Sequence, residues 1–183
     1  MIDHLCDNLS QITYEVLAEL AVIYATKMDK TYKGLFFEKT KEKFFKELKY
    51  LKEETLYKIL WACVKAGELT ISENSSEWQG IKQVIISRSK ELSPKVFSDI
   101  LVLSTLESKQ EINSKSADLF SSVEADLIIS MKSMALDDLL NLMWSALEID
   151  RGSQFFFQTL EAELAKRVRG IKDDQFETLI GCF

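Results

Sequence analysis

The chain has 183 residues, of which 46% are hydrophobic and 28% charged, and its formal net charge is −6. This composition excludes an intrinsically disordered chain, and the length suffices to bury a sizeable hydrophobic core. One proline and six glycines are few helix breakers for so many Leu, Lys, Glu and Ala residues, so helices are favoured over strands.

The same apolar spacing recurs five times, at relative positions 0, 5, 8 and 9, with sets that begin at Ile12, Leu51, Leu92, Met134 and Ile171. The starts lie 39, 41, 42 and 37 residues apart. A period near 40 residues in helix-forming sequence indicates a helical solenoid. We therefore expect an all-α fold in a single domain over 1–183, a right-handed α–α solenoid of four helical hairpins plus a terminal helix.

The expected repeats cover approximately 12–50, 51–91, 92–133 and 134–170, followed by a half repeat over 171–183. Their helices are expected at about 9–28, 34–50, 51–66, 77–91, 94–108, 116–132, 134–149, 154–169 and 172–182. Local signals mark several ends: Ser93-Pro94 is typical of a helix start, and Gly67 of a helix end with positive φ. Because no single hairpin can bury both of its faces, neighbouring repeats are expected to stack.

Charge is distributed unevenly along the repeats. Between Lys27 and Lys58 ten lysines face six acids, a local +4, whereas 111–164 holds three basic residues and ten acids, a local −7. These runs are either solvated helix faces or two patches of opposite sign that dock different partners. If the basic run contacts phosphate, the candidate RNA face consists of Lys39, Lys43, Lys46 and Lys49.

The final half repeat has no second helix behind it. It either caps the solenoid or presents an open face that another subunit covers, in which case the interface residues are Phe176, Leu179, Ile180 and Phe183. The three rings of 155–157 cannot all point inward from one helix turn. Phe155 and Phe157 are therefore further candidate interface residues.

No constellation for catalysis is visible, and we predict that the protein is not an enzyme and holds no cofactor or metal. His4 is the single histidine, which rules out a two-histidine metal site, and no glycine-rich phosphate-binding motif occurs. The acid pairs Glu53-Glu54, Asp137-Asp138 and Asp173-Asp174 each fall in the first turn of an expected helix, where the helix dipole favours carboxylates.

Three widely spaced cysteines, Cys6, Cys63 and Cys182, do not form a disulfide framework and fit a reducing compartment such as the cytoplasm. Cys63 lies on an apolar helix side and is interpreted as a small core residue. No apolar run approaches the roughly 18 residues of a membrane span. The first residues carry acids and no arginine, unlike a secretory signal or a cleavable transit peptide, which leaves import by an internal signal open.

Two segments carry a family resemblance: LYKILWACVKAG at 56–67 and LLNLMWSALEIDRGSQFFFQTLEAELAKRV at 139–168. Trp61 and Trp144 occupy the same repeat position, ten residues after the repeat start, and small residues follow both. This pattern resembles the heptatricopeptide and octotricopeptide class of organellar helical repeats, which also accompanies the RAP domain. The first and third repeats depart from it, with Val22 and Val102 at the tryptophan position, and no RAP domain is present.

The resemblance implies a helical-repeat protein of mitochondria or plastids. We expect a non-catalytic scaffold or accessory subunit that docks other proteins within a large mitochondrial complex of the respiratory-chain or ATP synthase type. The alternative is an RNA-contacting protein, such as a mitoribosomal subunit that meets rRNA or mRNA. The acidic net charge and the small number of repeats favour the scaffold. No small-molecule substrate is evident.

Overall fold

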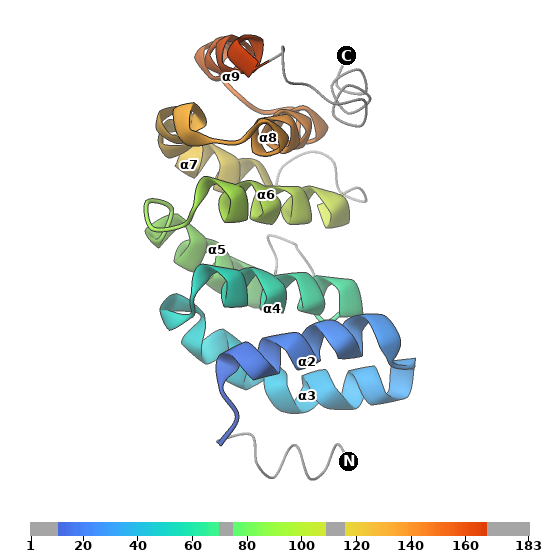
Figure 1. Cartoon of the computed structure of the whole chain (residues 1–183). Helices are drawn as coiled ribbons and strands as arrows, with labels where there is room; N and C mark the ends of the chain where they lie inside the picture. Colours follow the sequence, from blue (N-terminus) through green and yellow to red (C-terminus); the bar gives the residue numbers. More distant parts are fainter. Residues whose placement is uncertain (1–10, 70–74, 109–115, 168–183) are drawn as a thin grey trace. The chain divides into compact units, whose positions relative to one another are not determined.

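The computed structural model describes residues 11–69, 75–108 and 116–167. Over these ranges the chain forms eight α-helices and two short 3-10 helices, and it contains no strand (Figure 1). The predicted all-α class is therefore confirmed. None of the helices described combines the length and the apolar character that crossing a membrane requires.

Contacts divide the chain into two compact units, Met1–Val84 and Ile85–Phe183. The boundary falls inside one helix, α5 (Ser76–Ser87), so that most of this helix belongs to the first unit. The expectation of a single domain over 1–183 stays a prediction.

The first unit is built on a helical hairpin of α2 (Tyr14–Lys27) and α3 (Lys30–Glu47), and the 3-10 helix η2 (Leu48–Tyr50) leads on to α4 (Glu53–Ala66). Helix α4 packs along α2 (Figure 1). Phe36 lies at the centre of the hairpin core, stacked on Tyr24 with ring centroids 4.3 Å apart and edge-on to Phe37 at 5.2 Å. Burying such rings stabilises the packing of α2 against α3.

The second unit repeats this plan with α6 (Pro94–Ser108), α7 (Ser116–Ser130), the 3-10 helix η3 (Met131–Ser133), α8 (Leu136–Glu148) and α9 (Gln154–Arg167). Helix α8 packs along α6, and α9 contacts both α7 and α8. Phe120 and Phe156 meet edge to face at 5.0 Å in the core between α7 and α9. Each unit thus places the first helices of two consecutive predicted repeats side by side.

Helix ends follow the local signals in the sequence. Ser93 Oγ accepts a hydrogen bond from the Val96 N–H at 3.4 Å, and α6 begins at Pro94 as predicted. Gly67 ends α4 with φ of 77° and donates its N–H to the Val64 carbonyl at 2.9 Å. In both places one or two residues at the helix end therefore set its boundary.

Three predicted boundaries differ from the structure by four residues or more. Helix α2 begins at Tyr14, not at about 9, because Thr13 is its N-cap and accepts a hydrogen bond from the Val16 N–H. Helix α3 begins at Lys30, four residues earlier than expected, because the Asp29 carboxylate accepts hydrogen bonds from the N–H groups of Thr31 and Tyr32. Helix α5 ends at Ser87, before the predicted 91, because Glu91 and Leu92 both donate to the Arg88 carbonyl and form a turn. The helix predicted over 172–182 lies outside the described residues.

Candidate partner-binding surface

Two of the six predicted interface residues lie within the described residues, and four do not. Phe176, Leu179, Ile180 and Phe183 lie outside the described residues. Phe155, in the first turn of α9, is 63% exposed. Phe157 is half-buried, with its ring edge-on to Phe156 at 5.3 Å. The structure thus leaves Phe155 available to a partner and packs Phe157 partly into the second unit.

The predicted lysine face is only partly formed. Lys39, Lys43 and Lys46 are spaced by four and three residues and share one side of α3, because such residues are neighbours on a helix surface. Lys39 and Lys46 are exposed. Lys49 lies beyond the end of α3, in η2, where its Nζ is 4.6 Å from the ring centroid of Tyr50. Three of the four predicted lysines therefore form one row.

Lys43 joins this row to the start of α2. Its Nζ lies 5.1 Å from the ring centroid of Tyr14 and donates a hydrogen bond of 3.4 Å to the Ile12 carbonyl. A cation over an aromatic ring is attracted by the negative charge of the ring face. The half-buried Lys43 is thereby held between the two helices.

An apolar row on α2 was missed by the sequence reasoning. Val16 is 51% exposed and Ile23 43% exposed, and the half-buried Leu20 lies between them. Spacings of four and three residues place all three on one side of α2. The sequence signal is present in the run VLAELAVIYA, in which apolar residues go round the whole helix instead of keeping to one face.

The apolar row and the lysine row lie on the same side of the hairpin. On α2, the opposite side carries Ala18, Glu15 and Glu19, which line the contact with α4. On α3, the opposite side carries Lys41, whose Nζ is 2.8 Å from the Glu77 carboxylate of α5. Both rows therefore point away from α4 and α5. We call their joint surface the outer face; it consists of Val16, Leu20 and Ile23 of α2 and Tyr32, Leu35, Lys39, Lys43 and Lys46 of α3.

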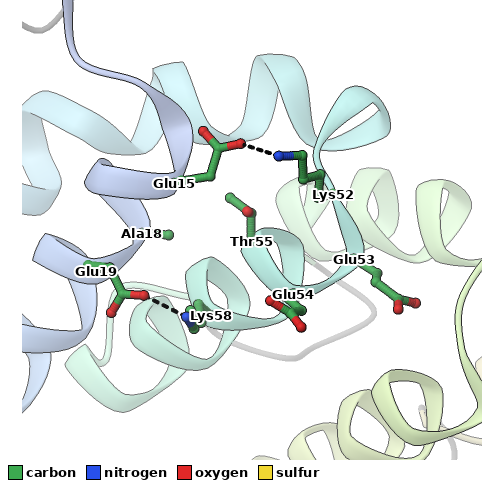
Figure 2. Close-up of a pocket in the computed structure, with 8 residues that line it drawn as sticks. All are labelled: Glu15, Ala18, Glu19, Lys52, Glu53, Glu54, Thr55 and Lys58. Atoms are coloured by element: carbon green, nitrogen blue, oxygen red, sulfur yellow. Dashed lines mark hydrogen bonds and ion pairs between the residues drawn. The ribbon is translucent and has the colours of Figure 1, made fainter.

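The other face of α2 forms a hollow of about 420 Å³ with the start of α4 (Figure 2). Two ion pairs cross it, Lys52 Nζ to Glu15 Oε1 at 3.0 Å and Lys58 Nζ to Glu19 Oε1 at 2.5 Å. A hydrogen bond to its own backbone N–H, together with Lys52, lowers the pKa of Glu15, and the hydrogen bond with Glu19 raises the pKa of Lys58. These paired charges join α2 to α4.

The acid pairs occupy the positions predicted for them. Glu53 and Glu54 lie in the first turn of α4, and Asp137 and Asp138 in the first turn of α8. Burial raises the pKa of Asp138, whose carboxylate also accepts a hydrogen bond from the Ala135 N–H. This bond satisfies a backbone donor at the start of α8, which gives the buried acid a structural role. Asp173-Asp174 lies outside the described residues.

Cys63 is fully buried in α4, and burial raises the pKa of its thiol to about 12. A thiol with so high a pKa is not a nucleophile near neutral pH, so Cys63 serves as a small core residue, as predicted. Within the ranges 11–69, 75–108 and 116–167, no three His, Cys, Asp or Glu side chains gather closely enough to hold a metal ion.

Comparison of the chain with protein-family models, with curated proteins and with solved structures gave no match.

Proposed function

We propose that the protein is a non-catalytic helical-repeat scaffold that docks other protein chains, and that its two units are parts of one α-solenoid of four hairpins and a terminal helix. The repeat plan supports this proposal. In the first unit α4 packs along α2, and in the second α8 packs along α6, so consecutive first helices stack in both. Stacked hairpins offer extended surfaces to partners.

The outer face is the observation that carries the docking role. Val16, Ile23, Tyr32 and Leu35 are between 42% and 53% exposed, and their helical spacing places them on the side of the α2–α3 hairpin that points away from α4 and α5. Scattered exposed apolar side chains are ordinary on protein surfaces, whereas a contiguous group rimmed by charges is typical of an interaction site. Covering this group with a partner would remove its apolar area from water.

The cellular setting is supported by the resemblance of the Trp61 and Trp144 segments alone. On that basis we propose a place within a large mitochondrial complex of the respiratory-chain or ATP synthase type. In native extracts the protein should then migrate with a large assembly, and ribonuclease treatment should leave that migration unchanged. A free monomer in organelle extract would contradict the proposal.

A second candidate function, contact with RNA as in a mitoribosomal subunit, is favoured by the exposure of Lys39 and Lys46. Phosphate binding by this row would show strong salt dependence. Titration of single-stranded and duplex RNA at about 50 mM and about 200 mM salt tests it, since each phosphate contact lowers the affinity as salt rises. Absence of binding at the lower salt concentration, or unchanged binding by a variant with Lys39, Lys43 and Lys46 changed to Glu, would reject RNA contact through this face.

A further inference from the structure

We propose that the outer face accepts one amphipathic α-helix of a partner protein, with an apolar side against α2 and a row of carboxylates against α3. This inference rests on the proposed docking function and specifies the partner's chemistry. It uses three observations: the burial of the equivalent positions in later repeats, the length of the two rows, and the arrangement of charge around them.

The second and fourth repeats show what covers this side of a first helix. Val16, Leu20 and Ile23 stand 4, 8 and 11 residues after the repeat start at Ile12, and the same offsets from 51 and 134 give two equivalent sets. The equivalent residues in α4 and α8 are at most 9% exposed: Thr55, Ile59, Ala62, Asp138, Leu142 and Ser145.

A neighbouring helix packs along each of those two helices, α2 along α4 and α6 along α8. In the first repeat the same positions remain exposed, because no described helix packs on the outer side of α2. The repeat plan itself therefore makes a helix the natural occupant of the outer face.

The side chains in the first repeat also differ in size or polarity from their equivalents. Ala62 in α4 is small where Ile23 in α2 is large, and the polar Thr55 stands where Val16, a side chain of the same size, is apolar. Small residues allow two helices of one chain to approach closely, whereas larger apolar residues give an incoming helix a broader surface to contact.

The two rows have the length of a short helical contact. Val16 to Ile23 and Lys39 to Lys46 each cover eight residues, or seven steps of 1.5 Å and about 10 Å in all. A partner helix with apolar residues spaced by three and four would match the first row, which is the usual pattern of helix-in-groove recognition. Carboxylates at the same spacing along its flank would meet the lysines.

The charges on α3 favour a narrow occupant. Lys43 contacts Tyr14, and Phe36 stacks on Tyr24, so these two residues mark the side of α3 that faces α2. The exposed Glu42 and Glu38 lie about 100 to 160° further round the helix. Glu42, three residues after Lys39 and four before Lys46, borders the lysine row, and Glu38 lies beyond it.

A single helix, about 10–12 Å wide, that lies along α2 meets the lysines on the α2 side of α3 and stays clear of Glu38. A broad anionic surface, either a membrane or a nucleic acid, would meet Glu38 and Glu42 together with the lysines and be repelled by them. The arrangement of charge therefore favours an acidic helix over both of these alternatives.

The test uses the full chain and a fluorescent synthetic peptide of about 20 residues, long enough to be helical in an alanine background. The peptide carries Leu at positions i, i+4, i+7 and i+11, with a flanking row of Glu. One control peptide replaces every Glu by Lys, and another has the same composition in scrambled order. Binding is followed by fluorescence anisotropy at two salt concentrations.

We expect saturable binding of the acidic peptide, weaker at higher salt, and at least about tenfold weaker binding of the Lys peptide. The double variant Val16→Gln/Ile23→Gln and the double variant Lys39→Glu/Lys46→Glu should each lose at least about tenfold in affinity. Lys65→Gln, an exposed substitution on α4, should stay within about twofold of the wild type. Far-ultraviolet circular dichroism checks that each variant is folded. If Val16→Gln/Ile23→Gln does not fold, the affinity of Lys39→Glu/Lys46→Glu decides the result.

Four results would overturn the proposal. The first is equal binding of the acidic and Lys peptides, and the second is an affinity that the outer-face variants do not change. The third is binding to anionic lipid vesicles or RNA, but not to the peptide, that the outer-face variants abolish. The fourth is a peptide that binds only after residues 1–10 are deleted, or only after self-association of the chain is abolished. In either case the occupant of the outer face would be a segment of this chain or a second copy of it, not a partner protein.

Failure of the peptide test and failure of the scaffold role are distinguishable. If no peptide binds while the protein still migrates with a ribonuclease-resistant assembly, the docking function stands and the acidic-helix partner is rejected. If the protein is a free monomer in native extract, the docking function itself is rejected.

Discussion

Lys43 of α3 lies over the ring of Tyr14 of α2, with its Nζ 5.1 Å from the ring centroid. The same ammonium group donates a hydrogen bond to the Ile12 carbonyl at 3.4 Å. This single side chain thus connects the lysine row to the beginning of the helix that carries the apolar row. It adds one direct contact between the two helices that carry the rows of the outer face.

Replacing Lys43 by Met should lower the free energy of unfolding by about 0.5–1 kcal/mol, because the cation–ring attraction is lost while most of the apolar stem remains. Tyr14→Phe keeps the ring and should leave this contribution in place, and Tyr14→Leu should remove it. Urea unfolding curves of the three variants measure the effect. Equal stability of Tyr14→Phe and Tyr14→Leu would show that the ring contact contributes nothing.

Two glycines in the first unit should respond oppositely to alanine. Gly67 has φ of 77°, and an added Cβ would meet nothing within 4 Å, so its cost comes from the backbone alone. Gly67→Ala should destabilise by about 1–2 kcal/mol. Gly80, inside α5, is equally open, and Gly80→Ala should stabilise by about 0.5–1 kcal/mol. Thermal unfolding of the pair tests this, and a shift in the same direction for both would contradict the assigned end of α4.

Asp138 should make the second unit less stable as the pH rises. Burial raises its pKa above the ordinary value of 3.8. The negative charges of Asp99 and Asp137 also raise this pKa, whereas the positive charge of Lys95 lowers it. Between 3.8 and the raised value the folded protein binds more protons than the unfolded protein, so stability falls through that window and stays lower above it.

Asp138→Asn keeps an oxygen that can accept from the Ala135 N–H and carries no charge. Its stability relative to the wild type should therefore improve as the pH rises through this window. Chemical denaturation at pH values on both sides of the window measures the difference. A relative stability of the variant that does not change with pH would contradict the raised pKa.

Glu163 should behave in the opposite way. Hydrogen bonds from Lys166 at 2.6 Å and from Arg167 at 2.8 Å lower its pKa below 4.5. Its contribution to stability is therefore complete above pH 4.5 and is lost as the pH falls through the lowered value. Glu163→Gln should lower the melting temperature at neutral pH and have little effect below the folded pKa. The exposed Glu161→Gln on the same helix is the matched control.

Much of the fold could be predicted from short-range signals. Ser93 and Pro94 give the start of α6, and Gly67 gives the end of α4, because each signal acts on its own helix end. The apolar spacing that begins at Leu51 and Met134 locates α4 and α8, since a buried helix side repeats every three to four residues. The early start of α3 required recognising Asp29 as a cap, and that residue lies outside the apolar pattern.

The candidate surface was harder to predict, because exposure depends on neighbours that are distant in sequence. Leu20 fits the buried pattern as well as Ile59 does, yet Ile59 is fully buried and Leu20 is half-buried. The difference is that α2 packs along α4, whereas no described helix packs on the outer side of α2. Likewise, only three of the four predicted lysines share one side of α3, because Lys49 lies beyond the end of that helix.

The measurement that tests the account most directly is the migration of tagged full-length protein in ribonuclease-treated native extract. It compares the wild type, Val16→Gln/Ile23→Gln and the control Lys65→Gln. The account predicts that the wild type and Lys65→Gln migrate with a large assembly, and that the outer-face variant, although folded, is released from it. Identical migration of all three proteins, whether bound or free, would contradict docking through the outer face.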